Sequence, residues 1–341
     1  MYMKTLYVII IYTLFINLLI FFLKKKNFLI DKKILKHKKF VSKNVVPIAG
    51  GFLIILNLVL FNNNYYLIFF SFLIFFLGIF SDLLVITSAK VKFIIQSFII
   101  ILFLYFMNLN IGFTKIFFLD YALKYKFISF LFTCFCLSVL INGSNFMDGV
   151  NTLVCGYYIS VILTILYITS HNNIFYHFNE LYYLFISLVI IFIFNFFSKI
   201  YLGDAGTFLL SFVIGYNLIT LYNDNLNLSI PISPIFIALL LWYPVFENLF
   251  SIIRKIKNNF NPLKPDNFHL HHLLFIFFKK KIKLNYANSL TGSLINFYNI
   301  VIFFYASNFY FNTKYLTYLL FLNFFIYILV YFYLNKRVNI Q

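Results

Sequence analysis

The sequence predicts an all-α integral membrane protein with about ten or eleven transmembrane helices. Only 11% of its 341 residues are charged and 63% are hydrophobic, with a mean hydropathy of +0.92, whereas about a quarter of the residues in a soluble domain are charged. Apolar runs of nearly twenty residues recur along the chain, and each can cross a hydrocarbon core of about 30 Å. Because these runs are continuously apolar and do not alternate, we expect helices and not the strands of a β-barrel.

Polar breaks divide the chain into eleven expected helices. They cover residues 5–23, 45–61, 65–80, 93–108, 127–142, 152–170, 181–197, 207–222, 230–252, 286–308 and 316–335. No small-residue cleavage site follows the long first run, so we expect no cleavable signal peptide. The cysteines Cys134, Cys136 and Cys155 lack metal-ligand spacing and are interpreted as packing residues. We treat residues 1–341 as a single transmembrane domain.

The distribution of lysine and arginine orients these helices. With the N-terminus outside, the cytoplasmic loops and tail hold all but five of the 27 basic residues, as the positive-inside rule requires. The five exceptions are Lys4, Lys115, Lys124, Lys126 and Lys314. The net charge of +18 therefore reflects topology in part, and nucleic-acid binding is not expected without a soluble basic domain. The remaining charge should attract anionic headgroups and anionic substrates to the cytoplasmic face.

Most of the acids and histidines gather on the same predicted face. Six of the nine acids and four of the six histidines lie at or near cytoplasmic loops: Asp31, Asp82, Asp148, Asp204, Glu247, Asp266, His37, His269, His271 and His272. A carboxylate at a helix end beside a membrane is costly unless it is paired, solvated or bound to metal. Several helix ends that present acids to one side therefore indicate a site.

Two motifs are ambiguous when taken singly. In PIAGG, Gly50 and Gly51 open an apolar helix, where glycine permits close approach of a ligand or of another helix. Helix packing is the favoured interpretation for that motif alone. In GIFSDLLVITSAKVKFIIQ, residues 78–96, Asp82 ends one helix, and Lys90 and Lys92 precede the next. A solvated loop and a functional site explain this second motif equally well.

Two further motifs favour a metal. In INGSNFMDGVNTL, Asn142, Asn145, Asp148 and Asn151 recur every three residues, so in helical form they would lie near one face. Their oxygens suit a hard cation such as Mg²⁺, and packing between helices needs fewer polar groups than these. In GDAGT, Asp204 opens a helix, where it can act as a cap and also leave room for a metal or a phosphate.

The last cluster favours phosphate contact. Glu247 and Arg254 are seven residues apart, two helical turns along one face. Asp266 then makes a good helix start, which places His269 and His272 on one side as an i, i+3 pair. Zinc sites usually draw on nearby thiolates or carboxylates, and no cysteine is close in sequence. Phosphate or nucleotide contact is therefore the expected role of the histidines.

Taken together, five motifs resemble a known family. PIAGG, GIFSDL…K, NGSNFMDG, FN…KIYLGDAGT and KPDNFHLHHLL follow one another over residues 25–275. They closely resemble the polyprenyl-phosphate N-acetylhexosamine-1-phosphate transferases, which are glycosyltransferase family 4 membrane enzymes. The resemblance implies Mg²⁺-dependent transfer of a sugar 1-phosphate from a UDP-sugar to polyprenyl (undecaprenyl) phosphate, with release of UMP. It also implies a bacterial cytoplasmic membrane, a cytoplasm-facing site and a role in starting cell-surface polysaccharide synthesis.

The motifs and the resemblance together define a candidate site. It has metal contacts Asn145 and Asp204, catalytic residues Lys43, Asp82 and Asp148, and substrate contacts Asn142, Asn195, Glu247, Arg254, His269, His271 and His272. The chain has Ser81 and Asn151 where the family often has Asp, which we interpret as subfamily variation. A phosphate monoester with a second pKa near 6 is mostly anionic at pH 7, so no strong base is required. Mg²⁺, Lys and His would offset charge repulsion; direct attack is favoured, and an aspartyl-phosphate route remains open.

Two alternatives accompany this assignment. A transporter or lipid flippase would place charges near the midplane in broken helices, whereas here the acids fall at helix ends on one side. Within the family, the alternative is the phospho-N-acetylmuramoyl-pentapeptide transferase of peptidoglycan synthesis, but HLHHLL resembles the hexosamine enzymes more closely. The sugar, the polymer and the oligomeric state stay open, with a homodimer among the alternatives.

Overall fold

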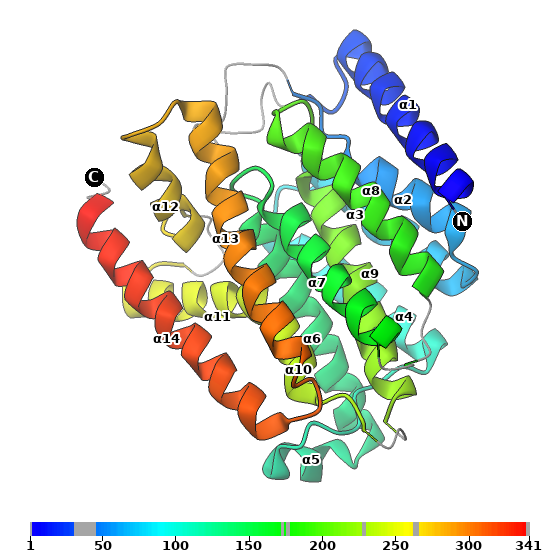
Figure 1. Ribbon diagram of the computed structural model, residues 1–341, viewed down its shortest axis with the longest axis vertical. Coiled ribbons are helices and arrows are strands. Elements are labelled where there is room, and N and C mark those ends of the chain that lie inside the picture. The colour runs from blue at the N-terminus through cyan, green and yellow to red at the C-terminus, as the bar shows by residue number, and fades with distance from the viewer. Residues whose placement is uncertain are drawn as a thin grey trace.

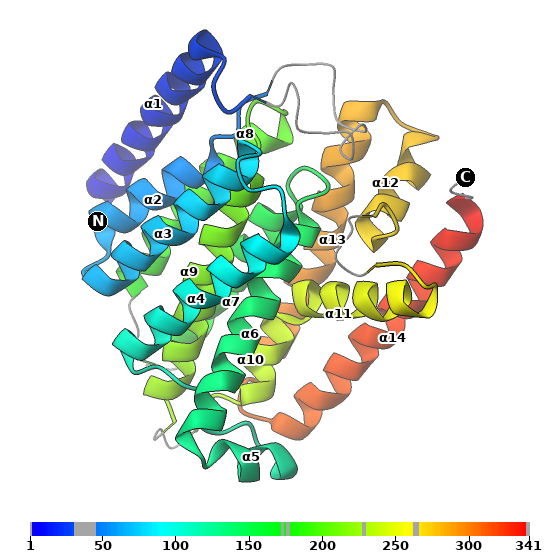
Figure 2. The same ribbon diagram turned by 180° about the vertical axis from the view of Figure 1, so that it is seen from behind.

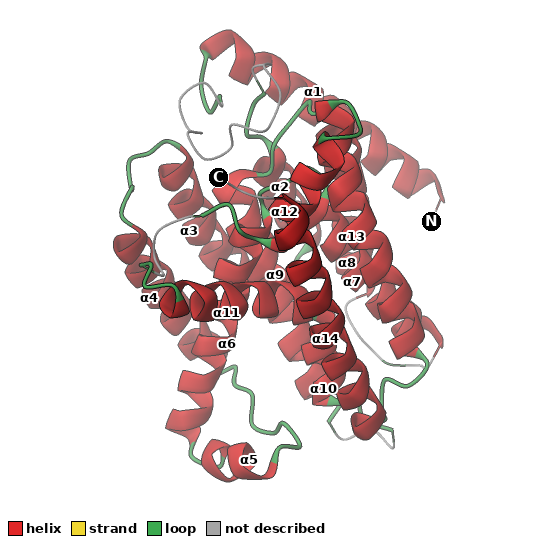
Figure 3. Ribbon diagram, turned by 90° about the vertical axis from the view of Figure 1, so that its left-hand side faces the viewer, coloured by secondary structure: helices red, strands yellow, loops and turns green. Residues whose placement is uncertain are grey.

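The protein is a bundle of helices, as the sequence predicts (Figure 1). A computed structural model describes residues 2–30, 46–171, 174, 178–226, 230–261 and 266–338, and within these ranges it contains helices and two isolated β-bridges but no strand (Figure 3). The helices are α1 (Tyr2–Lys26), α2 (Gly50–Phe61), α3 (Tyr65–Asp82), α4 (Ala89–Met107), α5 (Phe117–Leu123), α6 (Lys126–Met147), α7 (Leu153–His171), α8 (Phe178–Phe196), α9 (Gly203–Asp224), α10 (Pro234–Leu240), α11 (Trp242–Lys257), α12 (Leu270–Lys279), α13 (Leu284–Ser307) and α14 (Thr313–Val338).

The described helices bear out a polytopic membrane protein. Nine of them are long and apolar enough to cross a membrane, and ten if α10 and α11 count as one broken span. The expected span at 45–61 corresponds to α2, a shorter apolar helix of 12 residues. The short helices α5 and α12 lie outside the expected spans.

The expected helix at 230–252 is wrong in one respect, because the chain bends by 71° between α10 and α11. Pro244 lies in the first turn of α11. Proline has no N–H to donate to the carbonyl of Leu240 four residues earlier, and its ring crowds that carbonyl. A continuous helix would need that hydrogen bond, so the chain breaks at Leu241. As a result α11 lies across the bundle and not along it (Figure 2).

The long helices run along the bundle, so that their termini gather at its two ends. Helices α3, α6 and α8 end where α4, α7 and α9 begin, and we call this the Asp204 end. The end of α1, the helix α12 and the C-terminus lie toward it, whereas α5 and the α13–α14 turn lie at the opposite end (Figure 1). Within the described residues, one contiguous cluster of buried apolar side chains runs from Val8 to Val338.

Helix α9 is the buried centre of the bundle, in contact with α2, α3 and α6. A Cβ atom on Gly78 of α3 would lie 2.3 Å from the Cα of Ala205, and one on Gly51 of α2 would lie 3.1 Å from the Cα of Gly206. The glycines of PIAGG thus serve helix packing, the interpretation that this motif alone favours. These close approaches bring the end of α3, with Asp82, against the start of α9.

Candidate active site

The start of α9 is fixed by the carboxylate of Asp82. Gly203 has a φ of +71°, and a Cβ there would lie 2.8 Å from an Asp82 oxygen, so only glycine fits. One Asp82 oxygen accepts from the backbone N–H of Asp204 and the other from that of Ala205, each at 3.0 Å. Asp82 is therefore a buried cap on the positive end of the α9 dipole. It holds the turn that carries Asp204.

The side chain of Asp204 is held by two donors. The hydroxyl of Ser81 donates to its Oδ2 atom, and the ammonium of Lys92 lies 3.4 Å from the same oxygen. Ser81 stands where the family often has Asp, and here it provides a hydrogen-bond donor and not a second negative charge. Lys92 is one of the two lysines singled out after Asp82 in the sequence. Both donors hold the Asp204 side chain in place.

Asn145, the second predicted metal contact, lies near Asp204. The hydroxyl of Thr207 is 3.4 Å from Asn145 Oδ1 and 3.2 Å from the backbone oxygen of Asp204. That hydroxyl donates mainly to the carbonyl of Gly203, at 2.9 Å. Its contact with Asn145 is therefore weak and leaves the amide oxygen available for a ligand.

These donors fit Mg²⁺. Among the described residues no group of three or more His, Cys, Asp or Glu side chains is placed to hold a metal ion, so a closed zinc site is not formed there. Mg²⁺ usually keeps several waters and is bound through one or two carboxylates and the substrate phosphates. One carboxylate with one carboxamide is the donor set expected for such a site.

The loop after α6 brings Gly149, the residue that follows Asp148, to the histidines. Asp148 is the C-cap of α6, one helical turn after Asn145. A Cβ atom on the next residue, Gly149, would lie 2.5 Å from His271 Nε2 and 2.5 Å from His272 Cε1. The last turn of α6 thus connects the Asp204 group of residues to the histidine group.

His271 is fully buried, and neither ring nitrogen has a hydrogen-bond partner within the described part of the chain. Burial, with His272 and His269 nearby, holds the pKa of His271 well below its usual range. The ring is therefore neutral at pH 7. A buried polar group without a partner is costly, so these nitrogens are candidates for contact with a ligand.

His269 is oriented by two carboxylates. Its Nδ1 atom lies 2.8 Å from Oε1 of Glu247, and its Nε2 atom lies 3.6 Å from Oδ1 of Asp266. The hydroxyl of Tyr327 donates to the other Glu247 oxygen at 2.8 Å. Glu247 is 1% exposed, so it acts on the site through His269.

Arg254 fixes the segment that precedes the histidines. One guanidinium nitrogen lies 3.0 and 2.9 Å from the two Asp266 oxygens, and another donates to the carbonyl of Phe268 at 2.8 Å. Burial raises the pKa of Asp266, but the neighbouring His269 and the basic side chains of Arg254 and Lys255 lower it more. The pKa of this carboxyl therefore lies below its usual range, and the ion pair persists at neutral pH.

Two further predicted residues, Asn142 and Asn195, bind backbone groups of the protein. Asn142 donates to the carbonyl of Ser138 in its own helix. Asn195 accepts from the N–H of Thr152 at 2.5 Å and donates to the carbonyl of Ile200 at 2.8 Å, so it joins two loops.

The expected helical stripe ends early, because α6 stops at Met147. Asn151 therefore lies in the following loop and not on the α6 face with Asn145. Lys43 lies outside the described residues. The sequence interpretation predicts the helix at 286–308, which is α13, but it missed the role of its polar side chains, which bind the loop after Asp148.

Comparisons with known proteins show what this chain is similar to. The family model for "Glycosyl transferase family 4" matches residues 64–222. A probable undecaprenyl-phosphate N-acetylglucosaminyl 1-phosphate transferase of Bacillus subtilis is 30% identical over 215 residues, which are 61% of this chain and 57% of that protein. Two undecaprenyl-phosphate alpha-N-acetylglucosaminyl 1-phosphate transferases match shorter stretches. The Thermotoga maritima protein is 29% identical over 85 residues, 25% of each chain, and the Escherichia coli K12 protein is 28% identical over 76 residues, 22% of this chain and 20% of that one.

The matched stretches thus span less than two thirds of these relatives' own length. The matched region runs from the start of α3 through α9. It contains Asp82, Asn145, Asp148 and Asp204, whereas the histidines lie beyond it. The resemblance seen in the motifs is confirmed, because residues 64–222 match the model of glycosyl transferase family 4 and the similar proteins carry names from the same group of transferases.

Proposed function

We propose that this protein transfers an N-acetylhexosamine 1-phosphate from a UDP-sugar to a polyprenyl phosphate and releases UMP. The observation that carries the proposal is the Asp204 carboxylate, held by Ser81, Lys92 and the Asp82 cap, with Asn145 beside it. The names of the relatives make undecaprenyl phosphate and N-acetylglucosamine the first substrates to test.

The proposal puts the Asp204 end on the cytoplasmic side, where UDP-sugars are available. The last turn of α1 carries Lys24, Lys25 and Lys26, and the last turn of α14 carries Lys336 and Arg337. Both turns lie toward the Asp204 end (Figure 1). This distribution follows the positive-inside rule.

In the proposed reaction an oxygen of the lipid phosphate attacks the β-phosphorus of the UDP-sugar. A new P–O bond forms to the lipid, and the bond from the β-phosphorus to the bridging oxygen breaks, so UMP leaves with that oxygen and its electron pair. The lipid phosphate is already mostly anionic at pH 7. The task of the protein is therefore to orient two anions and reduce their repulsion.

The residues divide this task. Asp204 and Asn145 would hold Mg²⁺, which when bound supplies positive charge to the phosphate oxygens. Asp82 positions Asp204 through the α9 backbone, and His269, oriented by Glu247, with His271 and His272 would contact the nucleotide phosphates. Asp148 lies between these two groups, and Lys43 stays a predicted contact.

UMP release tests the proposal. Purified protein should release UMP when given undecaprenyl phosphate, Mg²⁺ and at least one of a panel of UDP-N-acetylhexosamines, and chelation of Mg²⁺ should stop release. A protein that shows a cooperative thermal transition but releases no UMP with any sugar would contradict the proposal.

A further inference from the structure

The loop between α6 and α7 is held on its far side by α13. This loop, residues 148–152, presents Gly149 to the histidines. Helix α13 lies outside both the family-matched region and the motif-bearing range of the sequence. Neither the family match nor the sequence motifs therefore gives a role to the contacts between α13 and the loop.

Three side-chain hydrogen bonds join α13 to two consecutive loop residues. Oδ1 of Asn288 accepts from the backbone N–H of Asn151 at 2.8 Å. Nδ2 of Asn296 donates to the backbone carbonyl of Thr152 at 2.9 Å. The hydroxyl of Thr152 lies 3.1 Å from the backbone oxygen of Ser289 and can donate to it. Asn288 is 2% exposed and Asn296 is 8% exposed, so water does not compete for these bonds.

The loop is held in a strained conformation. Thr152 has a φ of +68°, which is a genuine outlier for a β-branched residue. Such a conformation persists only where the surrounding structure enforces it, and it is found disproportionately at functional sites. A Cβ atom on Gly292 of α13 would lie 2.2 Å from the backbone oxygen of Asn151, so the helix backbone and the loop are in direct contact.

The same helix also supports the histidines. Helix α12 carries His271 and His272, packs against α13, and is separated from the start of α13 by only four residues. The contact between Gly149 and the histidine rings thus joins two segments that both pack against α13. A shift of the loop on α13 would move Asp148 and Gly149 relative to the rings.

We infer that Asn288 and Asn296 of α13 are positioning residues for the transfer reaction. They hold the strained 148–152 loop so that Gly149, with Asp148 next to it in the chain, keeps its position against His271 and His272. The inference rests on the proposed function for its catalytic consequence. It extends the site to a helix that neither the motifs nor the family match includes.

The test compares two buried asparagines of the same helix. Asn288→Leu removes the acceptor at similar volume, and Asn288→Asp keeps an acceptor oxygen. The matched control is Asn299→Leu, because Asn299 is fully buried on α13 and accepts from Trp242 Nε1 at 2.8 Å, away from the loop. A purely structural role predicts that the two leucine variants behave alike.

We expect Asn288→Leu to lower kcat for UMP release by about 10- to 100-fold, because small misplacements of reacting groups are this costly. KM for the UDP-sugar should stay within about twofold, since the effect falls on the reaction and not on uniform binding. Asn288→Asp should recover most of the kcat. Asn299→Leu should lower Tm but keep kcat, measured well below its Tm.

Hydrogen exchange of the loop amides supplies a readout that needs no turnover. In Asn288→Leu, the Asn151 and Thr152 amides should exchange at least about ten times faster than in the wild type, whereas in Asn299→Leu they should not. Unchanged exchange, or a kcat equal to that of Asn299→Leu, overturns the inference and leaves the proposed function standing. A folded wild type that releases no UMP overturns the proposed function instead. The exchange result then decides by itself whether Asn288 holds the 148–152 loop.

Discussion

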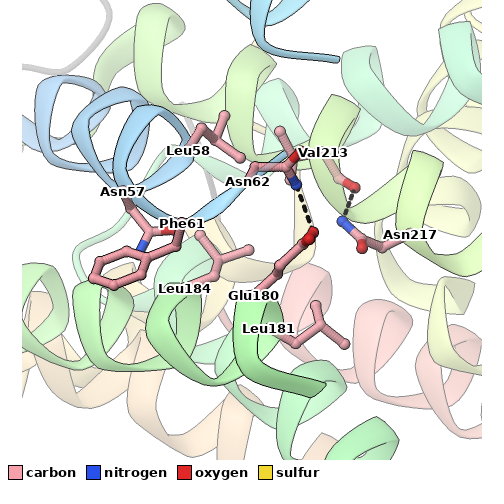
Figure 4. A pocket seen from close by; sticks show the side chains of 9 residues that line it. All are labelled: Asn57, Leu58, Phe61, Asn62, Glu180, Leu181, Leu184, Val213 and Asn217. Atoms are coloured by element: carbon pink, nitrogen blue, oxygen red, sulfur yellow. Dashed lines mark hydrogen bonds between the residues drawn. The ribbon is translucent and has the colours of Figure 1, made fainter. Parts of the chain in front are cut away.

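The two ends of the bundle both contain carboxylates and carboxamides, but they arrange them differently. At the opposite end, a pocket lies between α2, α8 and α9 and is lined by Asn57, Leu58, Phe61, Asn62, Glu180, Leu181, Leu184, Val213 and Asn217 (Figure 4). There Asn62 donates to Glu180 at 2.6 Å, and Asn57 donates to the hydroxyl of Tyr12 at 2.7 Å. These polar groups bind one another and join neighbouring helices.

At the Asp204 end the carboxylates face cationic or N–H groups. Asp204 meets Lys92, Asp82 meets two backbone amides, and Glu247 meets His269. None of the described residues that line the opposite pocket is basic. Helix α9 runs between the two ends, and its dipole is positive at Asp204 and negative at Asp224. The difference is that the acids of the proposed site lie beside donors and positive charge, which a phosphate-binding site needs, whereas the described residues that line the opposite pocket supply no positive charge.

The largest expected effect is a difference in the rate of UMP release between variants of the two acids of α9, Asp204 and Asp224. Asp204→Asn should lower the rate of UMP release by more than about 10³-fold, because charge stabilisation by a bound metal is worth several kcal/mol. Asp224→Asn, at the other end of the same helix, is the matched control and should leave the rate within about twofold. Equal rates in the two variants would remove Asp204 from the reaction.

A smaller effect is expected from removing the Ser81 hydroxyl, which donates a hydrogen bond to Asp204. Ser81→Ala should lower kcat about tenfold and raise the Mg²⁺ concentration needed for half-maximal rate, because a hydrogen bond to a charged group contributes about 1.5–3 kcal/mol. Ser71→Ala is the control, since Ser71 is a fully buried residue of the same helix whose hydroxyl has no hydrogen-bond partner among the described residues. If Ser81→Ala and Ser71→Ala have the same Mg²⁺ requirement, Ser81 does not position Asp204.

The third prediction concerns stability against pH. Because the pKa of His271 is held well below its usual range, the unfolded chain takes up a proton below about pH 6.5 that the folded chain does not. Stability from this residue is therefore complete above that pH and is lost as the pH falls, by at most about 1.4 kcal/mol per pH unit.

Thermal melting of detergent-solubilised protein between pH 7.5 and pH 5.5 measures this loss. His271→Gln should flatten the acid decline in Tm, whereas His171→Gln, at an exposed position on the opposite end, should not. An acid decline that is equally steep in His271→Gln would show that the buried ring is not its cause.

The smallest effect is expected at the opposite pocket. Glu180→Gln keeps an acceptor for Asn62, so the free energy of unfolding should change by less than about 1 kcal/mol, and UMP release should be unaffected. UMP release and Tm measured together on this variant test whether the opposite pocket contributes to stability but not to turnover. A tenfold loss of turnover at unchanged Tm would mean that the two ends act together.

The sequence predicts the fold class and most helix positions because long apolar runs dictate membrane helices. It also groups Asn145, Asp148 and Asp204 correctly on one end of the bundle. It does not reveal that Asp82 caps α9, since that contact depends on the close approach of Gly78 to Ala205, residues more than a hundred positions apart.

The role of α13 was missed for a similar reason. Asn288 and Asn296 read as isolated polar residues in an apolar helix until the loop at Thr152 is seen against them. The break before α11 was accessible in principle, because Pro244 stands within the expected span. A sequence pattern does not show which polar groups form hydrogen bonds with each other and which can bind a ligand.

The central claim is that the Asp204 end carries out sugar 1-phosphate transfer, and the fate of the β-phosphate tests it most directly. UDP-N-acetylglucosamine carrying radioactive phosphorus only in the β-phosphate should be incubated with the protein, Mg²⁺ and undecaprenyl phosphate, and the lipid then extracted. The account predicts that the label moves into the lipid fraction while unlabelled UMP appears in the aqueous phase, and that Asp204→Asn abolishes both. Label that stays in aqueous UDP while sugar reaches the lipid would contradict it.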